Sequence, residues 1–334
     1  MQADQHLKDL ATKFWGNPPD KIEALAKAGS DRIYHRLSLG AQMAISTFNP
    51  NIAENKAFIY LSKHFQSKGI HVPEILAESG DGLSYLQSDL GDRSLFDHLQ
   101  ANGFSAALPF YQKSLLQLSA MQFQGTKAID PDQFFARPIF DRVSMRWDLD
   151  YAKYYFFRYF NPDLDESAWE RDCDTLLDWL ETAERSCFMH RDFQSRNIMI
   201  ADGETYFIDF QGGRMGHPAY DLASLLLQAR AGLSAEQRNE LLEYYIAHVA
   251  TFSSQWAASI RYYYPGFVWL RVLQTLGSYG YRGILQQKPH FLLSLDPAIK
   301  QASLLTQIAA LPFDLSYIRE QCAQLEQHKP WKNV

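Results

Sequence analysis

Residues 188–211, FMHRDFQSRNIMIADGETYFIDFQ, constrain the fold more than any other part of the sequence. Apolar residues alternate on both sides of Asp202-Gly203, and an Asp-Gly pair in such a setting is a strong β-hairpin signal. Asp192 precedes the hairpin predicted over residues 197–209, and Asn197 and Asp209 are the two ends of that hairpin. Because a hairpin brings its two ends together, the sequence predicts two carboxylates and one amide on the rims of a loop and a hairpin.

This set of side chains suits phosphoryl transfer. Mg²⁺ neutralises phosphate charge and binds carboxylate and amide oxygens together with phosphate oxygens. A further carboxylate must lie near the attacking hydroxyl, to orient it and accept its proton. Asp209 and Asn197 fit the metal roles and Asp192 fits the base role, whereas the plain alternative is that all three serve as loop caps and turn residues.

Two motifs in this stretch match a known pattern. HRDFQSRN at 190–197 matches the catalytic loop H-R-D-x-x-x-x-N, and Asp209-Phe210-Gln211 stands where D-F-G would be. The chain reaches its next expected helix near Ala219, which leaves no room for the activation loop of a protein kinase. Arg196, inside the catalytic-loop motif, is a candidate contact to the transferred phosphate.

The compact end GHPAYDLASLLL resembles the aminoglycoside phosphotransferase and choline kinase superfamily. The segments FMHRDFQSRNIM, YFIDFQGGRMGHPAYDLASLL and SDLGDRSL look most like the bacterial amino-sugar kinases. That resemblance covers most of the chain from about residue 29. It implies ATP and Mg²⁺ as cofactors and the anomeric hydroxyl of N-acetylmuramate or N-acetylglucosamine, in cell-wall recycling, as the acceptor.

The resemblance also implies an α+β, protein-kinase-like bilobal fold with a small antiparallel-sheet N-lobe and a mainly helical C-lobe. Hydrophobic spacing agrees with it, because the strand signals all lie before residue 90 except in the hairpin, and helices dominate from about residue 94. The expected lobes are residues 1–90 and 91–334. The expected elements of the first lobe are helices at 3–15, 19–28 and 52–67 and strands at 32–39, 43–48, 74–78 and 83–88.

By position in the family, two segments are expected to bind the nucleotide. Gly29, Ser30, Asp31 and Arg32 stand where the phosphate-covering loop belongs, although they do not form G-x-G-x-x-G. Gln87, Ser88 and Asp89 stand at the hinge between lobes, where the family binds adenine through backbone groups.

The lysine that the family carries in the second or third strand is missing, and Ser46 stands near its place. Arg32, Arg36 and Lys56 are the candidate replacements, and the sequence does not choose among them. Glu54 then has no lysine to pair with, and it can equally be a helix N-terminal acid.

Three more residues near the motif are expected to be structural. His190 and Arg191 are expected to brace the catalytic loop, and the resemblance implies that Asp221 accepts hydrogen bonds beneath it. Two segments are candidate walls of a pocket for the acceptor. Residues 146–160 offer aromatic rings with Asp148 and Asp150, although ordinary core packing explains them as well.

Residues 271–283 form the second candidate wall. Their glycines indicate the close approach of a neighbour or ligand. The polar residues that could bind an acidic substrate are Arg271, Tyr279 and Arg282.

Composition narrows the partners. The formal net charge is −6 and no run of lysine or arginine occurs, so neither nucleic acid nor a membrane surface is expected. Three widely spaced cysteines form no metal-type pair or disulfide framework, and no stretch of about 18 apolar residues exists. The cytoplasm is the expected compartment.

The sequence therefore predicts an ATP-dependent kinase that acts on a hydroxyl of a small molecule, foremost an amino sugar. Two alternatives stay open: a kinase of another small alcohol such as an aminoglycoside, choline or homoserine, and a pseudokinase that binds a nucleotide without turnover. The sequence does not decide the acceptor, the choice between ATP and GTP, or the oligomeric state.

Overall fold

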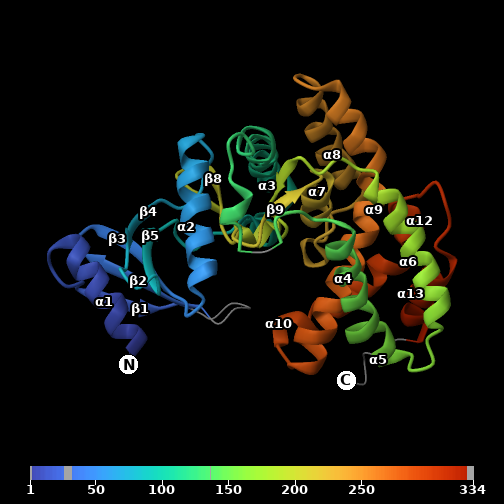
Figure 1. The fold of residues 1–334 in the computed structure, drawn as a ribbon, viewed down its shortest axis with the longest axis horizontal. Coiled ribbons are helices and arrows are strands. Elements are labelled where there is room, and N and C mark those ends of the chain that lie inside the picture. The colour runs from blue at the N-terminus through green and yellow to red at the C-terminus, as the bar shows by residue number, and fades with distance from the viewer. Residues whose placement is uncertain (1, 26–31, 136, 329–334) are drawn as a thin grey trace. The chain divides into compact units, whose positions relative to one another are not determined.

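A computed structural model describes residues 2–25, 32–135 and 137–328 (Figure 1). The chain divides into two compact units, which are described separately below. The first unit is Met1–Pro138 with Arg196–Gly213, and the second is Ile139–Ser195 with Arg214–Val334. The expected boundary near residue 90 lies inside the first unit, and the assignment of lobes to 1–90 and 91–334 stays a prediction.

The first unit contains an antiparallel five-stranded sheet in the order β1-β2-β3-β5-β4. The four strands predicted in this region are confirmed. Their bounds, with that of the additional strand β1, are β1 (Lys21–Ala24), β2 (Ile33–Leu39), β3 (Gln42–Phe48), β4 (Ile75–Glu78) and β5 (Ser84–Ser88).

The helix predicted over 19–28 is wrong, because residues 21–24 form strand β1 and residues 26–28 lie outside the described residues. Ile22 pairs with Leu37 of β2 and packs beside Leu37 in the core cluster of the unit. Pairing with a neighbouring strand therefore overrides the helical spacing of a short segment.

Two helices cover the opposite faces of this sheet. Helices α1 (Gln2–Trp15) and α2 (Ile52–Ser67) both confirm predicted elements. Leu10 of α1 packs in one cluster with Leu86 of β5. The next residue along the strand is Tyr85, which points to the other face and stacks on Phe58 of α2 with ring centroids 5.1 Å apart.

The predicted hairpin is confirmed and belongs to the first unit. Strands β7 (Ile198–Ala201) and β8 (Glu204–Phe207) pair in antiparallel register, and the turn η4 (Ser195–Asn197) precedes them. The amide of Ile200 donates to the Arg93 carbonyl at 2.8 Å, and the amide of Phe207 donates to the His71 carbonyl at 2.9 Å. The same unit holds α3 (Leu95–Ser119), η1 (Ala120–Gln124) and η2 (Pro131–Gln133).

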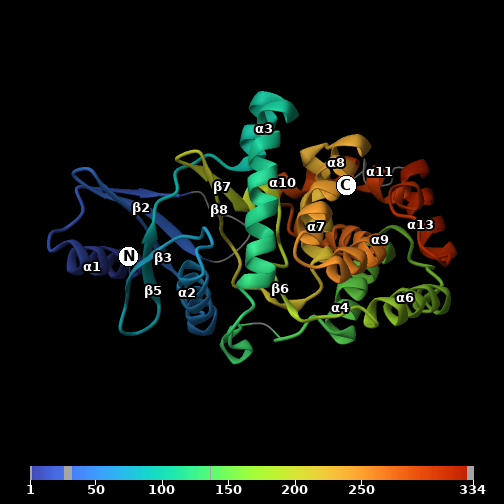
Figure 2. The ribbon, with the colours of Figure 1, turned by 90° about the horizontal axis from the view of Figure 1, so that it is seen from above.

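The second unit is almost wholly helical apart from the short ladder of β6 (Cys187–Met189) and β9 (Arg214–Gly216). Helix α9 (Ser254–Ser278) is central to it, because it packs against α4 (Arg142–Ala152), α7 (Ala219–Leu226) and α8 (Ala235–Ala250) (Figure 2). An antiparallel sheet followed by a mainly helical remainder confirms the predicted fold class. The other helical elements are η3 (Lys153–Phe157), α5 (Arg158–Phe160), α6 (Glu166–Glu181), η5 (Ala229–Ala231), η6 (Tyr279–Leu285), α10 (Pro289–Leu292), α11 (Leu295–Ser303), α12 (Leu305–Ile308) and α13 (Ser316–His328).

The glycines of 271–283 allow a close approach of neighbouring backbone. A Cβ on Gly280 would lie 2.0 Å from the Tyr155 carbonyl oxygen, and a Cβ on Gly277 would lie 2.7 Å from the Ala152 amide nitrogen. Of the two alternatives, neighbour or ligand, the structure shows a neighbour: these glycines let α9 and η6 lie directly against α4 and η3.

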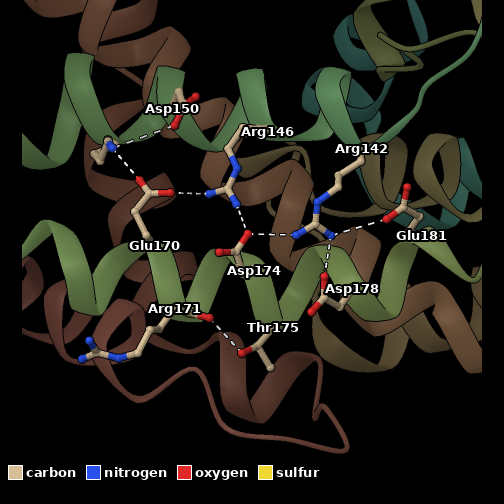
Figure 3. A network of polar contacts seen from close by, with 10 residues as sticks. Arg142, Arg146, Asp150, Glu170, Arg171, Asp174, Thr175, Asp178 and Glu181 are labelled. Carbon is tan, nitrogen blue, oxygen red and sulfur yellow. Dashed lines mark hydrogen bonds and ion pairs between the residues drawn. The ribbon is translucent and has the colours of Figure 1, made fainter.

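An ionic network holds α4 and η3 against α6 (Figure 3). Arg142 contacts Asp174 at 2.9 Å, and Arg146 contacts Glu170 at 2.6 Å. Lys153 contacts the same Glu170 at 2.6 Å. This network fixes the position of α4, the helix that carries Asp148. Within the described residues, no helix is both long and apolar enough to cross a membrane.

Candidate active site

The stretch singled out by the sequence is shared between the two units. The catalytic-loop motif up to Ser195 lies in the second unit, whereas Arg196, Asn197, the hairpin and Asp209 lie in the first.

In the second unit, the backbone of the catalytic loop is held by one buried carboxylate. Asp221 of α7 is fully buried and accepts hydrogen bonds from the amides of His190 and Arg191, each at 2.9 Å. Arg191 has a φ of +79°, a conformation that non-glycine residues rarely adopt and that surrounding contacts must hold. Asp221 therefore makes the contacts that the sequence predicted for it.

The side chain of Arg191 braces the loop against α4. Its Nη1 lies 2.7 Å from Asp148 Oδ2 and 2.5 Å from the hydroxyl of Tyr220, and its guanidinium lies over the Phe140 ring. Burial lowers the pKa of Arg191, but Asp148, Tyr220 and Asp192 together outweigh burial and hold that pKa above its ordinary value. Asp148, a sugar-binding or packing residue in the sequence interpretation, is thus a buried ion-pair partner of the loop.

Asp192, the predicted base, is anchored through one carboxylate oxygen. Its Oδ1 accepts from Nη2 of Arg271 at 2.6 Å and from Nε2 of Gln194 at 2.8 Å. The sequence offered Arg271 as a receptor for an acidic substrate, and no sequence signal connected it to Asp192. The structure buries its side chain and joins it to Asp192 and Gln274.

In the first unit, the two predicted metal ligands flank the open end of the hairpin. The carbonyl of Asn197 accepts from the amide of Ile208 at 3.0 Å, which continues the ladder one step beyond the strands. Asp209 follows with a φ of +64°, so it too has a left-handed conformation that needs support. Its side chain is 44% exposed, so the carboxylate is accessible to a ligand.

The residues after Asp209 supply that support. Phe210 stacks on Phe58 of α2, with centroids 4.9 Å apart and planes 11° apart, and meets the edge of Phe65. Gln211 donates from Nε2 to Asp209 Oδ1 at 2.8 Å. Its Oε1 is buried and has no hydrogen-bond partner within the described part of the chain. The aromatic contacts tie the position of Asp209 to helix α2.

Arg32, one of the three candidate replacements for the missing lysine, contacts both Asp209 and Glu54. Its Nη1 lies 3.2 Å from Asp209 Oδ1 and 3.1 Å from the Tyr34 hydroxyl, and its Nη2 forms an ion pair with Glu54 of α2. The Arg32 side chain is only 5% exposed. Glu54 also accepts from Asn49 Nδ2 at 2.9 Å. Arg32 therefore makes the pair with the helix acid for which the sequence had found no lysine.

The other two candidate cations do not make these contacts. Arg36 donates from Nε to Asp89 at 2.6 Å and also pairs with Asp92, which ties β2 to the segment after β5. Lys56 is exposed on α2. Of the three candidates, Arg32 is the one in contact with Asp209.

The remaining predicted nucleotide residues are placed only in part. Gln87 has a buried Oε1 with no partner among the described residues, and the Ser88 hydroxyl accepts from the Glu74 amide at 2.9 Å. Asp89 is held by Arg36. The three residues Gly29, Ser30 and Asp31 lie outside the described residues.

Arg196 is exposed in η4, and its predicted contact with the transferred phosphate stays a prediction. In the described ranges, no group of three or more His, Cys, Asp or Glu side chains could hold a metal ion.

Comparisons with a family model and with curated proteins both find phosphotransferases. Residues 21–256 match the model of the phosphotransferase enzyme family. The N-acetylmuramate/N-acetylglucosamine kinase of Pseudomonas aeruginosa is 27% identical over 233 residues, which cover 68% of this chain and 66% of that protein. The protein of the same name from Neisseria meningitidis is 26% identical over 236 residues, which cover 69% and 68%. The chain thus spans just under two thirds of the length of the P. aeruginosa relative.

Solved structures show the fold. Aminoglycoside phosphotransferase APH(4)-Ia, in a ternary complex with ADP and hygromycin B, superposes with a TM-score of 0.56 at 16% identity and covers 97% of this chain and 99% of its own. Choline kinase LicA from Streptococcus pneumoniae superposes with a TM-score of 0.56 at 12% identity and covers 100% of both chains. The chain therefore has the protein-kinase-like fold predicted from its sequence.

Asp221→Asn tests the anchoring of the catalytic loop. An amide offers one acceptor oxygen in place of two, so one buried backbone N–H loses its partner, and we expect the free energy of unfolding to fall by about 1–3 kcal/mol. Asp178→Asn, the same exchange at an exposed carboxylate of the network in Figure 3, should cost less than about 1 kcal/mol. Urea denaturation measures both, and equal losses would contradict the assigned role of Asp221.

Proposed function

The chain belongs to the phosphotransferase enzyme family, and from that membership we propose that it transfers the γ-phosphate of ATP to the anomeric hydroxyl of an amino sugar such as N-acetylmuramate or N-acetylglucosamine. The observation that carries the proposal is the open end of the hairpin, where an amide and an accessible carboxylate flank the strands. Four curated relatives with the same name support the acceptor.

Asn197 and Asp209 would hold Mg²⁺. One amide and one carboxylate are the oxygen donors that Mg²⁺ takes when nucleotide phosphates supply further ligands. Asp209 Oδ1 also contacts the guanidinium of Arg32, so the ion and Arg32 would share this carboxylate. The bound ion would neutralise the charge of the phosphates during transfer.

Arg32 would take the place of the family's lysine. It is buried, it pairs with Glu54 of α2, and its second nitrogen reaches the candidate metal ligand Asp209. A guanidinium donates through a planar fork, so Arg32 can keep one carboxylate partner while it turns another donor to a phosphate oxygen.

Asp192 would act as the general base. Its carboxylate would accept the proton of the acceptor hydroxyl as that oxygen attacks phosphorus, and Arg196 would contact the transferred phosphate. The adenine would bind to backbone groups of Gln87, Ser88 and Asp89, the segment that stands where the family binds adenine.

The acceptor would bind along α4 and η3, where the rings of Tyr151, Tyr155 and Tyr281 form a cluster. The ring centroid of Tyr155 lies 5.0 Å from the centroid of each of the other two rings. Aromatic faces suit the apolar face of a pyranose. An aminoglycoside is polycationic and would need free carboxylates, but the carboxylate of Asp148 already forms an ion pair with Arg191. This contact favours a sugar without multiple ammonium groups.

We also propose a cytoplasmic location. Cys173, Cys187 and Cys322 are free and buried, which fits a reducing compartment. A small-molecule alcohol remains the proposed partner.

Turnover with Asp192→Asn tests the proposal directly. With ATP and Mg²⁺, we expect the wild-type chain to phosphorylate N-acetylglucosamine or N-acetylmuramate, and Asp192→Asn to lower kcat by about 10²–10⁴-fold because the base is lost. Nucleotide affinity, measured by calorimetry, should stay unchanged.

Asp202→Asn is the matched control for this experiment, since Asn-Gly serves a hairpin turn as well as Asp-Gly and should leave kcat at the wild-type level. Unchanged turnover of Asp192→Asn would remove Asp192 from the mechanism. Nucleotide binding without turnover on any alcohol would instead identify a pseudokinase.

Arg32→Gln tests the replacement of the lysine. We expect ATP affinity to fall about tenfold, the equivalent of about 1.4 kcal/mol, because a phosphate contact is lost, while adenosine affinity stays unchanged. Lys56→Gln should alter neither affinity. Calorimetric titrations of both ligands distinguish the two variants, and an equal loss for ATP and adenosine would place Arg32 away from the phosphates.

A further inference from the structure

The centre of α9 presents one buried charge to the catalytic loop of its own unit. Arg271 is 6% exposed, and its two terminal nitrogens point to two different partners. Nη2 donates to Asp192 Oδ1 at 2.6 Å, and Nη1 donates to Gln274 Oε1, one turn along α9, at 2.8 Å. The guanidinium lies over the Tyr220 ring, 5.7 Å from its centroid.

Burying a guanidinium costs free energy, so the groups that it pairs with indicate which part of the structure it stabilises. Taking a charge out of water costs several kcal/mol, which only well-formed pairing offsets. Two arginines lie over Tyr220, and their carboxylate partners differ: Arg191 pairs with Asp148, and Arg271 pairs with Asp192. The first pair braces the loop backbone, whereas the second acts on the side chain proposed to perform the chemistry.

Two of the contacts on Asp192 share one atom. Arg271 and Gln194 both donate to Oδ1, so together they define the rotation of the carboxylate about its Cβ–Cγ bond. Gln194 belongs to the same loop and moves with Asp192. Arg271 belongs to α9, which packs against α4 and α7, so its hydrogen bond fixes the Asp192 carboxylate relative to residues outside the loop.

We propose that Arg271 is a positioning residue for the base: it orients the Asp192 carboxylate toward the acceptor hydroxyl and does not itself bind the acceptor. This rests on the proposed function of Asp192. Because its terminal nitrogens are bonded to Asp192 and Gln274, Arg271 has a role in kcat and little role in the KM for the acceptor.

Three variants on α9 test this. Arg271→Met fills the site with an apolar chain of similar length, and we expect kcat to fall about 10²-fold, the scale of a misplaced reacting group, at unchanged acceptor KM and nucleotide affinity. Arg271→Lys should give a kcat between those of Arg271→Met and wild type, because an ammonium restores the charge but not the fork. Arg261 lies on the same helix as Arg271 and pairs with the exposed Glu243 of α8, so Arg261→Gln should leave kcat unchanged.

A double-mutant cycle with Asp192→Asn separates positioning from a general loss of structure. If Arg271 acts through Asp192, then Arg271→Met should change the residual kcat of Asp192→Asn very little. An equal fold-loss of kcat in both backgrounds, or a raised acceptor KM with normal kcat, would overturn the proposal.

The outcomes distinguish this inference from the proposed function. A wild-type chain that phosphorylates no amino sugar but another alcohol refutes the proposed acceptor, and the same variants then test Arg271 with that alcohol. Wild-type transfer with an unaffected Arg271→Met refutes the positioning role alone, and absence of transfer to any alcohol refutes both. Should Arg271→Met fail to fold, Arg271→Lys decides: a lowered kcat at normal KM supports the proposal, and a wild-type kcat overturns it.

Discussion

A buried guanidinium needs a carboxylate partner, and in both units such a pair holds a segment that carries proposed site residues. In each unit, a buried arginine contacts a carboxylate that the sequence motifs single out. Removing the carboxylate would take a partner from a buried positive charge, so each contact helps to specify the position of its loop. These pairs are Arg32 with Asp209 and Arg271 with Asp192, and the partly exposed Arg191 forms a third pair with the buried Asp148.

Neighbouring contacts explain how two strained residues are maintained. Arg191 and Asp209 both have positive φ values, which cost of order 1–3 kcal/mol each unless the surroundings determine them. At Arg191 the surroundings are the carboxylate of Asp221 and the pair with Asp148. At Asp209 they are the stacked ring of Phe210 and the hydrogen bond from Gln211. The strain lies at a residue that braces the catalytic loop and at a proposed metal ligand, and the packing of each unit supports it.

Local signals in the sequence predicted much of this arrangement. The Asp-Gly turn gave the hairpin, and alternating side chains gave β2 and β3, because each depends on residues a few positions apart. The segment 19–28 was misassigned because the strand at Lys21–Ala24 is defined by its pairing with β2, and helical spacing in a short window carries no information about that neighbour.

Local sequence patterns could not predict the ion pairs between residues far apart in the chain. Arg32 could not be chosen over Arg36 and Lys56, because its partner Asp209 is 177 positions away. Arg271 was assigned to an acidic substrate because its partner Asp192 is 79 positions away and no pattern connects them. Composition and spacing identify which residue types carry the chemistry, whereas the packing of α9 and β2 decides which charges meet.

The most direct test of the account is a crystal structure of the chain with Mg²⁺ and a non-hydrolysable ATP analogue. The account predicts that the side-chain oxygens of Asn197 and Asp209 bind the metal and that the guanidinium of Arg32 contacts the phosphates. A metal bound by other side chains, or phosphates out of reach of Arg32, would contradict it.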